Sequence, residues 1–107
     1  MNTMGQMIEI SQQEDNTYKF YIKTESGQLL LTSRGVKSMD KIEQMTDLLK
    51  GSDKMRLLFE RKTNHQGKFL FNIKDKNGQL LGTSELYNSE AGMENGIKNL
   101  KIRIATL

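Results

Sequence analysis

The stretch Gly27-Gln28-Leu29-Leu30 recurs 51 residues later as Gly78-Gln79-Leu80-Leu81, and this repeated tetrapeptide decides how the rest of the chain is interpreted. The same offset needs no gap, and it superposes Thr32-Ser33 on Thr83-Ser84. Further matches keep this register: Glu9 with Glu60, Phe20 with Phe71, Ile22 with Ile73, Lys23 with Lys74, Ser38 with Ser89, Glu43 with Glu94 and Leu49 with Leu100. A sustained ungapped register predicts two copies of one structural unit.

Alternating residues precede the tetrapeptide in each half. Apolar side chains recur at every second position of 18–22 and again of 69–73, a pattern typical of a half-buried strand. Ser26-Gly27 and Asn77-Gly78 then predict tight two-residue hairpin turns. Earlier apolar runs, Met7 to Ile10 and Met55 to Phe59, supply a first strand for each half. Each half is therefore predicted to contain three antiparallel strands.

A helix is predicted after the third strand of each half. Ser38 and Ser89 stand where an N-cap hydroxyl accepts a hydrogen bond from the first turn. Helical spacing then places apolar residues on one face, namely Ile42, Met45 and Leu49 in the first half and Met93, Gly96, Ile97 and Leu100 in the second. Gly96 weakens its helix by about 1 kcal/mol relative to alanine. We therefore interpret Gly96 as a point of close packing.

These elements predict an α+β fold of two tandem β-β-β-α repeats. Neither a three-stranded sheet nor a single helix buries its apolar side alone, so both repeats are expected to share one core. The predicted architecture is a two-layer sandwich, with both helices packed on one face of an antiparallel sheet. The first repeat is assigned to residues 7–50, the connection to 51–55 and the second repeat to 56–102, all within a single domain of residues 1–107.

Composition narrows the class of protein. Hydrophobic residues make up 36% of the chain and charged residues 27%, as in ordinary globular domains. There is no cysteine, so disulfides and thiolate metal sites are excluded. The first residues lack the basic and apolar segments of a secretory signal, and no stretch is apolar enough to span a bilayer. We therefore expect a cytoplasmic protein that does not enter a membrane.

The second half resembles the YegP-like family of small bacterial proteins, a domain of unknown function. The residues that carry the resemblance are Gly67-Lys68-Phe69, Phe71, Ile73-Lys74, Asn77-Gly78, Thr83-Ser84-Glu85, Tyr87, Ser89, Ala91, Asn95-Gly96-Ile97 and Lys101. The first half departs from the family pattern at Val36, Asp40 and Met45, where the family favours tyrosine, alanine and glycine. The resemblance implies a β3-α unit, found as tandem repeats or as two subunits, with no known enzymatic activity.

No residue set predicts a catalytic, cofactor or metal site, so we expect a protein that is not an enzyme. His65 is the only histidine, and nothing near it in sequence suggests the positioned partner that acid–base catalysis needs. The hydroxyls of Ser33 and Ser84 lack a histidine–carboxylate pair and fit a capping role better. Recurring carboxylates, Glu9 with Glu60 and Glu43 with Glu94, either lie on the surface or meet at a pseudo-twofold axis and bind a metal.

One predicted surface lies on the outer face of the sheet. A two-residue turn at Ser26-Gly27 would pair Lys23 with Leu30 and Ile22 with Leu31, which turns Leu30 away from the helices. The same geometry applies to the second half. The candidate partner face therefore consists of Tyr21, Leu30, Leu70 and Leu81. A contiguous patch of this kind marks a partner site, whereas scattered apolar residues need no explanation.

A second predicted surface is basic. Residues 1–53 carry a net charge of −2 and residues 54–107 one of +5, within a total of +3. The candidate basic surface consists of Lys54, Arg56, Arg61, Lys62, Lys68 and Lys74. Three hypotheses follow. The favoured one is a non-enzymatic interaction module whose exposed sheet face or edge binds a protein partner or a second copy of itself, and the alternative is nucleic-acid binding through the second repeat. The third, a small-molecule enzyme or ligand binder, needs a concave pocket that two-layer packing of short units rarely leaves.

Overall fold

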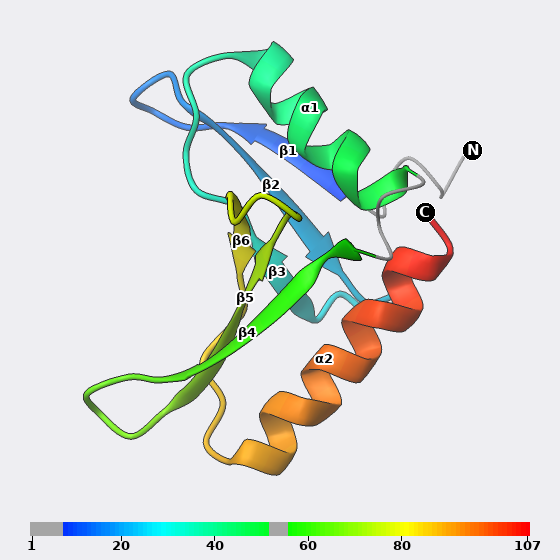
Figure 1. Cartoon of the computed structure of the whole chain (residues 1–107). Helices are drawn as coiled ribbons and strands as arrows, with labels where there is room; N and C mark the ends of the chain where they lie inside the picture. The colour runs from blue at the N-terminus through cyan, green and yellow to red at the C-terminus, as the bar shows by residue number, and fades with distance from the viewer. Residues whose placement is uncertain (1–7, 52–55) are drawn as a thin grey trace.

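The computed structural model describes residues 8–51 and 56–107, and within these residues it has an α+β fold of six strands and two helices (Figure 1). In chain order the elements are β1 (Ile8–Gln12), β2 (Tyr18–Lys23), β3 (Leu29–Thr32), α1 (Met39–Lys50), β4 (Leu58–Thr63), β5 (Phe69–Lys74), β6 (Leu80–Thr83) and α2 (Glu90–Ala105). The predicted strand start at Met7 and most of the predicted connection, 52–55, lie outside the described residues.

All six strands form one antiparallel sheet, in the order β1-β2-β3-β6-β5-β4. The two halves of the chain meet at the centre, where Thr32 of β3 stands opposite Thr83 of β6. The two first strands, β1 and β4, are consequently the outermost strands of the sheet. Each half contributes three consecutive strands followed by a helix, the order predicted from the sequence.

The turns between the second and third strands differ from the prediction. Thr24 N–H donates to the carbonyl of Gln28 over 2.8 Å, so the loop contains three residues, 25–27, rather than two. A two-residue turn would require a positive φ at both Ser26 and Gly27, but of these two only Gly27, at φ 94°, has one. Asp75 N–H donates to the carbonyl of Gln79 in the same way, and Gly78 has φ 83°.

The third strands also contain a bulge that the alternation did not predict. Ile22 stands opposite Leu31, as expected, but Lys23 stands opposite Leu29, so Leu30 is an extra residue in β3. An extra residue breaks the regular alternation of side chains, and Leu30 turns into the core, where it is 1% exposed. Leu81 occupies the equivalent place in β6 and is fully buried. The prediction that Leu30 and Leu81 lie on an exposed face was therefore wrong.

One hydrophobic cluster joins the sheet to both helices. Phe20 and Ile22 of β2 and Phe71 and Ile73 of β5 are completely buried in it. The predicted apolar faces of both helices are confirmed as buried: Ile42, Met45 and Leu49 in α1, and Met93, Gly96, Ile97 and Leu100 in α2. Helix α1 packs against β2, whereas α2 packs against β5 and β3.

The predicted helix starts are confirmed by hydrogen bonds. The Ser38 hydroxyl accepts from Lys41 N–H and the Ser89 hydroxyl from Gly92 N–H, both over 3.0 Å. Each bond satisfies one amide that the first helical turn leaves without a helical partner. Asp40 and Glu90 lie in the first turns, where their negative charge suits the positive end of the helix.

Candidate interaction surface

Polar side chains cover the centre of the sheet on the face opposite Phe20 and Phe71. We call this surface the open face and define it by Tyr21, Thr32, Asn72 and Thr83, with the flanking ion pairs described below. Tyr21 stands opposite Thr32, and Asn72 stands opposite Thr83. All four side chains are half-buried, so the open face contacts solvent along the middle of the sheet.

Two equivalent ion pairs flank the centre of the open face. Lys23 Nζ lies 3.2 Å from a Glu9 carboxylate oxygen, and Lys74 Nζ lies 3.2 Å from Glu60. These pairs are separated by the offset of 51 residues that relates the two halves. Each pair joins a first strand to the second strand next to it.

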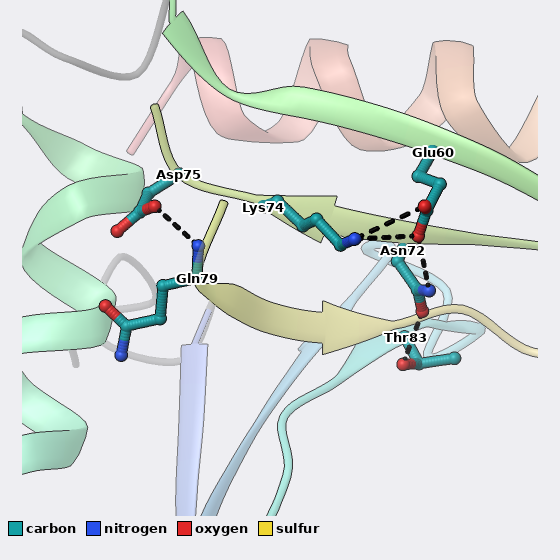
Figure 2. Close-up of polar contacts among 6 residues, drawn as sticks. All are labelled: Glu60, Asn72, Lys74, Asp75, Gln79 and Thr83. Carbon is teal, nitrogen blue, oxygen red and sulfur yellow. Dashed lines mark hydrogen bonds and ion pairs between the residues drawn. The ribbon is translucent and has the colours of Figure 1, made fainter. Parts of the chain in front are cut away.

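A hydrogen-bond network extends the second ion pair toward the middle of the sheet (Figure 2). Asn72 Nδ2 donates to Glu60 Oε1 over 3.1 Å, and Thr83 Oγ1 donates to Asn72 Oδ1 over 2.7 Å. The Asn72 hydrogen bond and then Lys74 lower the pKa of Glu60, because both favour the ionised carboxylate. A carboxylate held ionised in this way is a poor proton donor near neutral pH. The network therefore keeps Glu60 in its ionised form, in which it accepts hydrogen bonds from Asn72 and Lys74.

The candidate partner face is not contiguous. Tyr21 and Leu70 are half-buried on β2 and β5, whereas Leu30 and Leu81 belong to the core. Between β2 and β5 lie Thr32 and Thr83, which are polar. The apolar patch expected from sequence therefore reduces to two separate side chains.

The basic side chains of the candidate basic surface contact different residues of the protein or point to different faces of the sheet. Arg61 contacts Glu94 of α2 through two hydrogen bonds, with Nε 2.5 Å from Oε2 and Nη2 3.0 Å from Oε1, and this pairing lowers the pKa of Glu94. Lys74 pairs with Glu60, as described above, and Lys68 Nζ donates to the Asn88 side-chain oxygen. Lys62 follows Arg61 in β4 and so points to the opposite face. Arg56 is exposed before β4, and Lys54 lies outside the described residues.

The other sequence candidates have structural positions. His65 is exposed in the loop between β4 and β5. Ser33 and Ser84 are buried, and their hydroxyls accept from the amides of Phe20 and Phe71 over 2.9 Å. They link strands, as the capping interpretation predicted.

The alternative in which Glu9 and Glu60 meet at a pseudo-twofold axis was wrong. Glu9 lies in β1 and Glu60 in β4, which are opposite edges of the sheet, and Glu94 is occupied by Arg61. Among residues 8–51 and 56–107, no three His, Cys, Asp or Glu side chains cluster closely enough to hold a metal ion. No helix in the same residues has the length and apolar character needed to cross a membrane.

A groove that the sequence did not reveal lies between the β2–β3 loop and the last turns of α2. It has a volume of about 560 Å³ and is lined by Thr24, Glu25, Ser26, Leu30, Asn99, Ile102, Arg103 and Thr106. Arg103 Nε donates to the carbonyl of Lys23 over 2.9 Å, and its Nη1 lies 3.8 Å from Glu25. The guanidinium thus ties α2 to the loop.

Among residues 8–51 and 56–107 no strand pairs with the outer side of β1, which we call its free edge, and this edge presents a regular set of backbone groups. Phe20 of β2 directs its N–H to the Ser33 hydroxyl and its carbonyl to Ser33 N–H, so both groups face β3. Ile10 stands opposite Phe20, and its own N–H and carbonyl must therefore point away from β2. By alternation the same holds for Ile8 and Gln12. The edge of β1 offers the backbone groups of these three residues to a further strand.

The free edge of β4 is built in the same way. Phe71 directs its backbone to Ser84 and stands opposite Arg61, so the backbone groups of Arg61 point outward. Phe59 and Thr63 alternate with it and point outward as well. Both edges carry an exposed apolar side chain, because Ile10 is 42% exposed and Leu58 is 52% exposed.

Comparison with other proteins agrees with the resemblance found in the sequence. Residues 64–104 match the model of a family described as "Domain of unknown function (DUF1508)". The UPF0339 protein YegP of Escherichia coli O6:H1 is 31% identical over 92% of this chain and 90% of its own length. The UPF0339 protein encoded in the ptx operon 5' region of Stutzerimonas stutzeri is 33% identical over 92% of this chain and 88% of its own.

Two solved structures have the same fold. The solution NMR structure of YegP from E. coli has a TM-score of 0.81 at 31% identity, covering 91% of this chain and 84% of its own. The solution NMR structure of a UPF0339 protein from Shewanella oneidensis has a TM-score of 0.77 at 27% identity, covering 87% and 79%. On the identity and coverage of these relatives, the chain belongs to the UPF0339 family, the bacterial family of YegP.

Proposed function

We propose that this protein is a non-enzymatic interaction module that binds a protein partner along the free edge of β1. The observation that carries the proposal is the outward direction of the backbone groups of Ile8, Ile10 and Gln12. A partner in extended conformation adds to such an edge through main-chain hydrogen bonds, while side chains beside it provide specificity. Ile10, at 42% exposure, is the apolar side chain that a partner would cover.

The edge is a better candidate than the open face. On the open face, Lys23 and Lys74 are already paired with glutamates, and Asn72 is hydrogen-bonded on both sides. Because these polar groups already have partners within the protein, a partner that covered them would form few new hydrogen bonds. Backbone groups at a free strand edge lack strand partners, so adding a strand forms new hydrogen bonds.

We further propose that the two halves are copies of one β3-α unit, packed as a two-layer sandwich with both helices on one face. The matching ion pairs Glu9–Lys23 and Glu60–Lys74, the two serine caps and the two bulges support this interpretation. The assignment of residues 7–50 and 56–102 to the copies, and a cytoplasmic location, stay predictions from the sequence.

Replacing Ile10 with proline tests the edge. Proline lacks an N–H, and the N–H of Ile10 points away from β2. The substitution therefore removes a hydrogen-bond donor from the edge but breaks no hydrogen bond between β1 and β2. We expect Ile10→Pro to stay folded by circular dichroism and to lose the proteins that immobilised wild type captures from a native bacterial lysate. Leu58→Lys, on β4, is the control and should capture the same proteins as wild type. Equal capture by the Ile10→Pro variant would contradict the proposal.

Nucleic-acid binding is the second candidate function, favoured by the exposed Lys98 and Lys101 on α2 and by the basic second half. Pairing of Arg61 and Lys74 with carboxylates weakens it. We expect no saturable binding of a fluorescent single-stranded RNA or duplex DNA at low salt, measured by anisotropy. Binding that falls steeply with added salt, and is lost in Lys98→Glu/Lys101→Glu, would favour the nucleic-acid function instead.

A further inference from the structure

We infer that the partner at the β1 edge is a second copy of this chain, with the two β1 strands paired antiparallel about a twofold axis at Ile10. This inference rests on the proposed function and names the partner for that edge. The inference follows from the charges and the backbone directions on the two edge strands, β1 and β4. Strand β1 can pair with its own copy, whereas like charges oppose such pairing of β4.

Pairing of β1 with itself has one favoured register. Residues opposite each other in an antiparallel sheet point to the same face, so in each symmetric pairing one residue of β1 stands opposite its own copy. With Ile10 at that position, all three outward-facing residues are paired: Ile10 with Ile10 of the second copy, and Ile8 with Gln12 in both directions. A shift to Glu9 or Ser11 pairs only two of them. The shift to Glu9 also sets two like charges directly opposite, which is unfavourable.

The side chains agree with this register. Ile10 meets its own copy, so two exposed apolar side chains cover each other. Glu9 stands opposite Ser11 of the second copy and keeps its ion pair with Lys23. The open faces and the helix-covered faces of the two copies lie on the same sides, because the twofold axis is perpendicular to the sheet.

The β4 edge resists the same pairing. With Arg61 opposite its own copy, all three outward-facing residues pair, but two like-charged arginine residues, each also bound to a Glu94 carboxylate, stand opposite each other. A shift in one direction sets Glu60 against Glu60, and a shift in the other sets Lys62 against Lys62. Every register that pairs at least two outward residues therefore opposes like charges. Charged side chains commonly protect edge strands in this way.

By contrast, β1 carries no protective feature within its described residues. Its five residues, Ile8–Gln12, pair with β2 without a bulge and include neither proline nor a lysine or arginine. Its single charge, Glu9, stands opposite its own copy only in the shifted register centred on Glu9. Arg61 occupies the position of β4 that corresponds to Ile10 at the offset of 51 residues. The two halves thus differ at the residue that decides self-pairing.

Sedimentation velocity and light scattering over a concentration series test the inference. We expect wild type to form a reversible dimer at high micromolar concentration. Ile10→Arg, which copies the β4 residue, and Ile10→Glu should each raise the dissociation constant by about tenfold or more, because each sets like charges opposite. An equimolar mixture of the two variants should recover the dimer, since position 10 then faces the opposite charge. Leu58→Lys should dimerise as wild type does.

Each outcome has a defined meaning. Wild type that stays monomeric throughout the series, or a dimer that Ile10→Arg leaves unchanged, overturns the inference. So does a mixture of Ile10→Arg and Ile10→Glu that stays monomeric while each variant alone is folded. A monomeric wild type whose lysate capture still depends on Ile10 would refute the second copy as partner, yet leave the proposed function standing. Loss of both effects would refute the two together.

Discussion

Replacing Gly96 with methionine is expected to lower the free energy of unfolding by about 3 kcal/mol, because the substitution overpacks a buried contact. A Cβ atom at Gly96 would lie 2.6 Å from Cζ of Tyr87, closer than any real contact of this kind, and would overlap the Tyr87 hydroxyl. The Tyr87 ring stacks on Phe71 with centroids 6.5 Å apart, so it cannot move away without losing that contact. Urea unfolding followed by circular dichroism measures the effect.

The first half of the chain suggests the compensating change. At the equivalent positions it has Val36 and Met45, so a smaller side chain accompanies a larger one. Tyr87→Val/Gly96→Met should therefore be more stable than the sum of the two single variants predicts, by about 1 kcal/mol or more. Asn95→Met, at an exposed position of α2, is the control and should change the stability little. Additive effects in this double-mutant cycle would mean that Tyr87 and Gly96 are not coupled.

The hydroxyl of Tyr87 does not hold the ring in place. Among the described residues it is a buried side-chain oxygen without a hydrogen-bond partner. Burial, followed by the charge of Glu85, raises the pKa of Tyr87. The ring position therefore depends on packing against Phe71 and Gly96, which is why the Gly96 substitution should have a large effect.

Replacing Gly82 with leucine is expected to destabilise the protein by about 3 kcal/mol or more, since it overpacks the seam between the two halves. A Cβ atom at Gly82 would lie 2.8 Å from Cγ of Leu31 and 3.1 Å from the carbonyl oxygen of Thr32. Leu31 is fully buried, and a backbone carbonyl cannot rotate away as a surface side chain would. Thermal and urea unfolding should both show the loss.

The position equivalent to Gly82 in the first half is Leu31 itself. One large side chain therefore fills a space at the centre of the sheet that two would overfill. Leu31→Gly alone should destabilise by about 2 to 5 kcal/mol through the cavity that it leaves. The exchange Leu31→Gly/Gly82→Leu puts the side chain on the other side of the seam, and it should be more stable than either single variant. A double variant as unstable as both losses combined would contradict this account of the seam.

Several features could be predicted because they depend on local sequence. Ser38 and Ser89 begin helices through bonds to residues three positions ahead, and the alternation around Phe20 and Phe71 identifies the buried side of each strand. Gly96 was interpreted as a close-packing point, and the structure supplies its partner, Tyr87. The family resemblance was also carried by residues of these elements.

The prediction of which side chains lie on the exposed face of the sheet failed where the strand register shifts by one residue. A loop of three residues instead of two, followed by a bulge, turned Leu30 and Leu81 into the core. Because strand side chains alternate with period two, a shift of one residue reverses which face a side chain occupies. The candidate partner face depended on that shift, and our proposal therefore uses the edge of β1 in place of the open face.

The sequence by itself determined that each half carries three strands and a helix, because hydrophobic period, glycine turns and serine caps act over a few residues. Only the tertiary structure decided that β3 and β6 meet at the centre, that β1 and β4 are left at the edges, and that basic residues close in sequence face different partners. The physical reason is that strand order and register arise from packing between segments far apart in the chain, where one side chain such as Leu31 leaves room only for a glycine at position 82 of the neighbouring strand.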